Sequence, residues 1–135
     1  MRLWRRRAPA EPVRWDPDDP SLTVLVEAFD AARADSSVLA DSGLDLDRPL
    51  LVRHHLVGLP DAAAVERAAE LLAQADYVVR PGPGAPLALL ACRTQLLTGL
   101  SLSQERSRMA GLAQRLGGDV RGWDALGPVV DLAAP

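Results

Sequence analysis

The amino-acid sequence predicts an α+β fold in which a four-stranded antiparallel sheet is covered on one face by two helices, with an extra helix before them. Two observations support this prediction. The chain has 135 residues, which is the length of one domain. Between Leu50 and Asp124, short runs of β-forming residues alternate with two segments of helical periodicity. The resulting order, β-α-β-β-α-β with short connections, is typical of the ferredoxin-like sandwich.

The N-terminal region is expected to consist of two parts. Residues 1–19 contain prolines at positions 9, 12 and 17, a cluster at Arg5-Arg6-Arg7 and the aromatic residues Trp4 and Trp15, and they are predicted to form a flexible arm. Residues 20–47 are predicted to be helical, with Asp19 as the cap and Pro20 in the first turn. The apolar stripe of this helix would be Leu22, Leu25, Val26, Phe29 and Ala32, while Val38 and Leu39 either extend the helix or form a second short turn.

Residues 48–126 are expected to form the α/β domain. It begins with a strand at 50–59, followed by a helix of about fourteen residues that Asp61 caps. A strand at 77–80, a hairpin turn at 81–86 and a strand at 87–92 that extends to residue 97 come next. A helix then starts with a capping box at Ser101 and Gln104 and stops at Gly117-Gly118, and a strand at 119–124 follows it. Residues 127–135 are a tail, and no element is assigned from Ala125 onward.

Composition restricts the classes of function. Hydrophobic residues make up 48% of the chain and charged residues 24%, which is typical of a globular protein. The single cysteine, Cys92, excludes an intramolecular disulfide framework, and no secretion signal is recognised, so we expect a cytoplasmic protein. The longest uncharged run, 81–92, is too short to cross a bilayer. All 15 basic residues are arginine, which most simply reflects a high-GC coding sequence.

The sequence offers little catalytic chemistry. His54 and His55 are adjacent on a predicted strand and should therefore point to opposite faces, which makes a two-histidine metal site improbable and a structural role the better interpretation. Cys92 lies in an apolar run and should be buried. The glycine-rich turn lacks the residues of a phosphate-binding loop, and the loop carboxylates Asp41, Asp45 and Asp47 lack the calcium pattern. The arginines of the second helix, Arg106, Arg108 and Arg115, form an ordinary charged face. We therefore expect no cofactor, no metal and no enzymatic activity, and favour a surface that binds a macromolecule.

Two stretches resemble a known family. VRHHLVGLPDAAAVERAAELLAQADYVVR and the pair LALLACRTQLL and LAQRLGGDVRGWDAL are similar in order and spacing to the regulator of ribonuclease activity B (RraB) family, the ribonuclease E inhibitors. The resemblance covers Arg48 to about Leu126. Arg121 stands in the segment Val120-Arg121-Gly122-Trp123 where that family has Tyr-Asp-Gly-Trp, and the acidic C-terminal tail of the family's best-known members is absent.

The resemblance implies a non-catalytic protein that binds an RNase E/G-type endoribonuclease and lowers its activity on RNA. The partner-binding candidates are His54, His55, Arg121, Gly122 and Trp123. Two alternatives remain open: direct binding of RNA through the arginine arm with Trp4 or Trp15, and a small enzyme that uses His54 or His55. The oligomeric state is not predicted.

Overall fold

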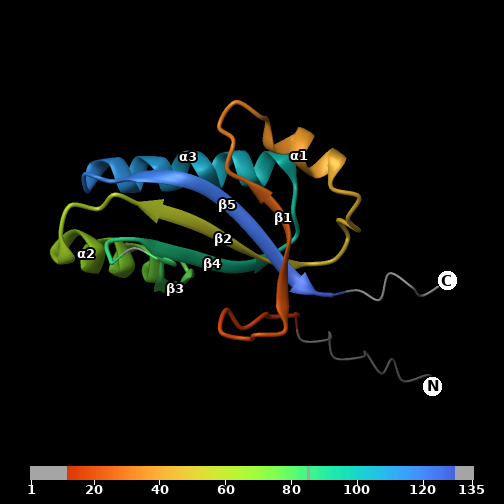
Figure 1. Cartoon of the computed structure of the whole chain (residues 1–135), viewed down its shortest axis with the longest axis horizontal. Helices are drawn as coiled ribbons and strands as arrows, with labels where there is room; N and C mark the ends of the chain where they lie inside the picture. Colours follow the sequence, from red (N-terminus) through yellow and green to blue (C-terminus); the bar gives the residue numbers. More distant parts are fainter. Residues whose placement is uncertain (1–11, 85, 130–135) are drawn as a thin grey trace, which may run out of the picture.

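Five strands and three helices make up the part of the chain that the computed structural model describes, residues 12–84 and 86–129 (Figure 1). In chain order they are β1 (Leu22–Ala28), α1 (Asp35–Asp41), β2 (Leu50–Val57), α2 (Ala62–Gln74), β3 (Val78–Pro81), β4 (Leu89–Gln95), α3 (Gly99–Arg115) and β5 (Asp119–Pro128). The strands form one antiparallel sheet in the order β1-β5-β2-β4-β3. The α+β class is confirmed, but the sheet has five strands where four were predicted.

The additional strand is β1, and it corrects the prediction of a helix after Pro20. Residues 22–28 satisfy a helical stripe, but they also alternate, and the β-branched residues Thr23, Val24 and Val26 favour a strand. Pairing with β5 decides between the two, because one side of β1 pairs with β5 from Leu22 to Ala28, with a register shift between Val24 and Val26. Val38 and Leu39 belong to the separate short helix α1, which matches the alternative of a second turn.

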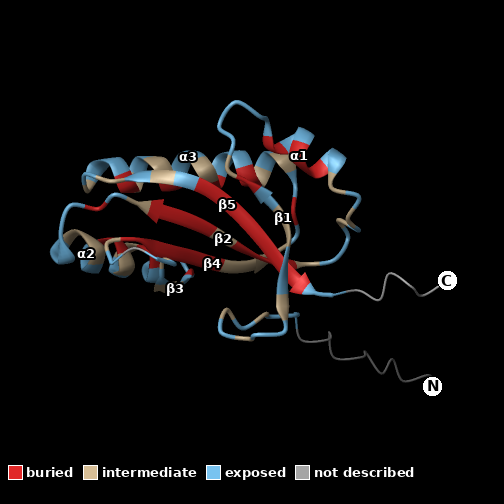
Figure 2. Ribbon diagram, viewed as in Figure 1, coloured by how far each residue is buried: buried red, intermediate tan, exposed pale blue. Residues whose placement is uncertain are grey.

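The helices cover one face of the sheet. Alternation in β2 directs Val52 and Leu56 toward α1, α2 and α3, whereas Leu51 points to the opposite, helix-free face. Figure 2 shows that β2, most of β4 and the C-terminal half of β5 are buried. The core on the helix side is mainly aliphatic and includes the fully buried Trp123.

The helix-free face is partly covered by residues 12–21, here called the strap. The indole Nε1 of Trp15 donates to the carbonyl of Pro49 at 2.9 Å, and the Trp15 amide donates to Thr94 Oγ1 at 2.9 Å. Arg80 binds both carboxylate oxygens of Asp18 at 2.8 Å. Residues 12–19 are therefore held against the sheet, which corrects the prediction of a flexible arm for this part. Trp4, the Arg5-Arg6-Arg7 cluster and residues 130–135 lie outside the described residues.

The remaining boundaries follow local chemistry. Asp61 caps α2 as predicted, accepting from the Ala64 amide at 2.8 Å. The third helix begins earlier than its predicted capping box, because Thr98 Oγ1 accepts from the Ser101 amide at 3.0 Å and places the helix start at Gly99. The last strand runs beyond Asp124 to Pro128, since β1 and β2 both pair with it. Among the described helices, none combines the length and apolar character needed to traverse a bilayer.

Candidate functional site

The two adjacent histidines of β2 contact separate polar clusters on opposite faces of the sheet. His54 is 1% exposed and faces α3, while His55 is 6% exposed and faces the helix-free side. The prediction that they cannot share one site is therefore confirmed. Each Nε2 lies 3.1 Å from a buried carboxylate, Glu105 for His54 and Asp124 for His55.

On the helix side, Glu105 is the centre of a buried hydrogen-bond cluster. Its Oε2 accepts from the hydroxyl of Tyr77 at 3.1 Å as well as from His54, and its Oε1 accepts from the amide of Gln95. Burial alone raises the pKa of Glu105, but the hydrogen bonds from His54, Gln95 and Tyr77 outweigh burial and hold it below its ordinary value. The carboxylate is therefore ionised at neutral pH and only accepts, so the Nε2 of His54 is the donor in this contact.

The same cluster changes the pKa of the Tyr77 hydroxyl. Burial, reinforced by the negative charge of Glu105, raises the pKa of Tyr77 to about 12. The guanidinium of Arg93 lies 3.8 Å from the Tyr77 ring centroid and donates to the carbonyl of Ala75 at 3.0 Å. These contacts connect α3, β4 and the end of α2. His54 is one member of this hydrogen-bond cluster, which indicates a structural role for it.

On the helix-free face, the carboxylate of Asp124 is bound by two side chains from β2. Arg53 Nε donates to Asp124 Oδ1 at 2.8 Å, and His55 Nε2 lies 3.1 Å from the same oxygen. Burial raises the pKa of Asp124, but the hydrogen bonds from Arg53 and His55 outweigh it and place the pKa below the ordinary value. The Arg53 side chain remains 21% exposed, so this cluster reaches the surface.

An aromatic side chain and a further arginine cover His55. Phe29, just after β1, packs edge-on against the His55 ring with centroids 5.0 Å apart. The guanidinium carbon of Arg121 lies 4.3 Å from the centroid of the Phe29 ring. Arg121 itself is exposed. A chain of contacts therefore connects the surface to the interior of the sheet in the order Arg121, Phe29, His55 and Asp124.

Gly122 is required by the backbone beneath this stack. The β2–β5 pairing shifts register between His55 and Leu56, and Gly122 has φ +145°. A Cβ at Gly122 would lie 2.2 Å from the carbonyl oxygen of Ala28. Only glycine allows β1 and β5 to approach this closely.

Trp123 points to the other face and anchors α1. Its Nε1 donates to Asp35 Oδ1 at 3.0 Å, and Arg106 and Ser103 from α3 bind the same carboxylate. Asp35 is buried, so Arg106 forms a partly buried ion pair and is not part of an ordinary charged face as predicted. Of the five predicted partner-binding residues, only Arg121 is exposed, whereas His54, His55, Gly122 and Trp123 are buried.

The other sequence candidates have structural surroundings. Cys92 is fully buried, as predicted, and burial raises its pKa to about 12. Asp41 and Asp45 form ion pairs with Arg33 and Arg48. Within residues 12–84 and 86–129, no group of three or more His, Cys, Asp or Glu side chains is arranged to hold a metal ion.

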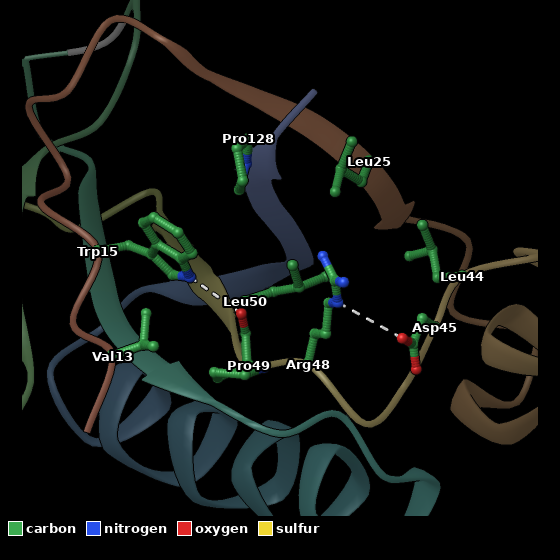
Figure 3. Close-up of a pocket in the computed structure, with 9 residues that line it drawn as sticks. All are labelled: Val13, Trp15, Leu25, Leu44, Asp45, Arg48, Pro49, Leu50 and Pro128. Carbon is green, nitrogen blue, oxygen red and sulfur yellow. Dashed lines mark hydrogen bonds and ion pairs between the residues drawn. The ribbon is translucent and has the colours of Figure 1, made fainter. Parts of the chain in front are cut away.

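A pocket of about 330 Å³ lies where the strap, β1, the segment before β2 and the end of β5 meet (Figure 3). Its lining is mainly apolar and consists of Val13, Trp15, Leu25, Leu44, Asp45, Arg48, Pro49, Leu50 and Pro128. Its two charged residues, Asp45 and Arg48, are 3.5 Å apart and pair with each other. The pocket can accept an apolar group but offers no catalytic side chain.

Sequence reasoning missed several residues of these clusters. It did not identify Glu105, Tyr77 or Asp124 as partners of the histidines, because these contacts join residues 51, 28 and 69 positions apart. Phe29 was assigned to a helical stripe. The alternation of β2 was the one available signal, since it places a charged residue, Arg53, on the same face as His55.

Comparison with known protein families gives a match over residues 33–125. The family model for regulator of ribonuclease activity B matches residues 33–125, from just before α1 into β5. No curated protein and no solved structure matches the chain. Because the family model covers more than half of the chain, the protein belongs to the regulator of ribonuclease activity B family.

Proposed function

We propose that the protein is a non-catalytic regulator that binds an RNase E/G-type endoribonuclease in the cytoplasm and modulates its cleavage of RNA. The observation that carries this proposal is the family match over residues 33–125, which includes both histidine clusters. In the same proposal, we interpret α2, α3 and strands β2 to β5 as a ferredoxin-like core to which β1 adds an edge strand.

The surroundings of the histidines support binding over catalysis. A catalytic histidine must reach substrate, but His54 and His55 are nearly or fully buried and each is engaged with a carboxylate. The helix-free face instead presents the exposed Arg121 and the partly exposed Arg53 and Phe29. Arginine and phenylalanine are residue types that are enriched at protein interfaces.

The RNA-binding alternative receives less support from the described residues. Trp15 was one of its two stacking candidates, but its indole is hydrogen-bonded to Pro49 and packed against the helix-free face. Direct RNA binding would then depend on residues 1–11, and it is an outcome that the following experiment distinguishes.

The test uses the full chain and the RNase E/G-type ribonuclease purified from the same organism. We expect the two proteins to form a complex in size-exclusion chromatography without RNA, and cleavage of a fluorescent RNA to slow as the regulator is titrated, reaching a plateau at saturation. RNA cleavage by the regulator alone would favour an enzyme. A mobility shift of RNA by the regulator alone, without a protein complex, would favour RNA binding. Unchanged cleavage together with no complex would refute the proposal.

A further inference from the structure

We propose that Arg121, supported by Phe29, is a contact point for the ribonuclease, with the guanidinium binding a single carboxylate that is flanked by apolar side chains of the partner. This inference rests on the proposed function and specifies the surface and the chemistry of the partner.

Within residues 12–84 and 86–129, Arg121 is a cation without a counter-ion. Among the described residues, no carboxylate lies within ion-pair distance of Arg121, whereas Arg53, Arg80 and Arg106 each bind an aspartate of this chain. The guanidinium of Arg121 lies over the face of the Phe29 ring. This contact leaves the N–H groups of the guanidinium available as donors. Those donors can form a two-point contact with a planar carboxylate.

The position of Arg121 is also held by the fold beneath it. The register shift at His55 and Leu56 and the positive φ of Gly122 fix the backbone next to Arg121. Phe29 is supported from below by the His55 ring. A side chain that is already positioned loses less conformational entropy on binding, so this arginine is suited to contribute strongly to an interface.

The surrounding charges favour a protein carboxylate over RNA. Glu27 is exposed and lies opposite Asp124 in the β1–β5 backbone register, so an exposed carboxylate lies beside the Arg53 end of this face. The chain also has a net charge of −3. A nucleic-acid backbone carries a charge at every nucleotide and would be repelled, whereas one carboxylate next to apolar side chains can bind Arg121 and contact Phe29.

The absence of lysine from the sequence allows a direct test. Carbodiimide joins a lysine amine to a carboxylate without a spacer, so R121K places a single side-chain amine at the proposed contact. R108K is the matched control, because Arg108 is exposed on α3, the helix that covers the opposite face, and has no ion-pair partner among the described residues. After treatment of each variant with the purified ribonuclease, we expect cross-linked peptides between position 121 and an Asp or Glu of the ribonuclease for R121K, and none for R108K.

Affinity measurements complete the test. We expect R121E to weaken binding to the ribonuclease roughly tenfold or more, and R108E, which makes the same change in net charge, to stay within about twofold. Thermal melting monitored by circular dichroism verifies that both variants are folded. If the wild-type protein binds and inhibits but R121E does so equally, the contact is refuted while the proposed function stands. If R121E loses affinity for RNA and not for the ribonuclease, the ligand is a phosphate. If the wild-type protein binds no ribonuclease, both proposals fail.

Discussion

Replacement of Glu105 by alanine tests the interpretation of the helix-side cluster. The substitution removes the acceptor of two buried donors, His54 Nε2 and the Tyr77 hydroxyl, and of the partly buried Gln95 amide. A buried donor left without an acceptor costs about 1 to 3 kcal/mol, and the Gln95 amide can turn toward water. We therefore expect the free energy of unfolding to fall by about 2 to 6 kcal/mol, which is a large part of the stability of a small domain.

Urea denaturation followed by far-UV circular dichroism at pH 7 measures this change. Glu66→Ala is the matched control, because Glu66 is exposed on α2 and should change stability by no more than about 0.5 kcal/mol. A loss of less than about 1 kcal/mol for Glu105→Ala would refute the idea that this carboxylate organises the cluster.

The pH dependence provides a second measurement on the same group. The pKa of Glu105 is lowered in the folded protein, so the unfolded chain binds more protons at acidic pH. The stabilisation is present above the unfolded-state pKa and is lost as the pH falls through the folded-state pKa. The difference in stability between wild type and Glu105→Gln should therefore shrink on acidification below about pH 4. A constant difference would contradict the assigned ionisation.

Three further predictions concern other parts of the fold. Tyr77 is the only tyrosine, so absorbance at 295 nm should report a single ionisation near pH 12 in the folded protein, and a midpoint near that of free tyrosine would show that its hydroxyl is not buried. Cys92 should react with Ellman's reagent slowly in the native protein and fast after unfolding. Trp15→Ala should accelerate the native reaction, because Trp15 packs against the Cys92 cluster, and equal native rates would show that the strap does not protect the thiol. Gly122→Ala should destabilise the protein by more than about 2 kcal/mol, because the new Cβ would meet the carbonyl of Ala28, and a neutral effect in urea denaturation would refute the close approach of β1 and β5.

The predictions from sequence succeeded where local chemistry decides the structure. Asp61 caps α2 because its side chain accepts from an amide three residues away. The strand predicted at 50–59 forms over Leu50–Val57, because its residues favour β structure and prolines flank the segment. Residues 22–28 fit either pattern, and their partner β5 begins almost one hundred residues later. The β-branched residues Thr23, Val24 and Val26 favour a strand locally, but the pairing with this distant partner decides the outcome.

The candidate site also combines features that local sequence predicts with features that depend on distant residues. Adjacent positions on a strand were enough to separate His54 from His55, and the apolar run was enough to bury Cys92. The carboxylates that bind the histidines come from α3 and β5, and the aromatic support of Arg121 comes from the end of β1. These contacts depend on the order of the strands in the sheet, which a single sequence does not encode locally.

The position of β5 also determines when the protein can fold during synthesis. This strand is the last of the described elements, yet it lies between β1 and β2 and supplies the pairing surface for both. Until residues 119–128 have left the ribosome, β1 has no hydrogen-bonding neighbour and one edge of β2 is open. Closure of the sheet therefore waits until synthesis has passed residue 128, so the nascent protein exposes unpaired strand edges to aggregation and to chaperones until β5 is released.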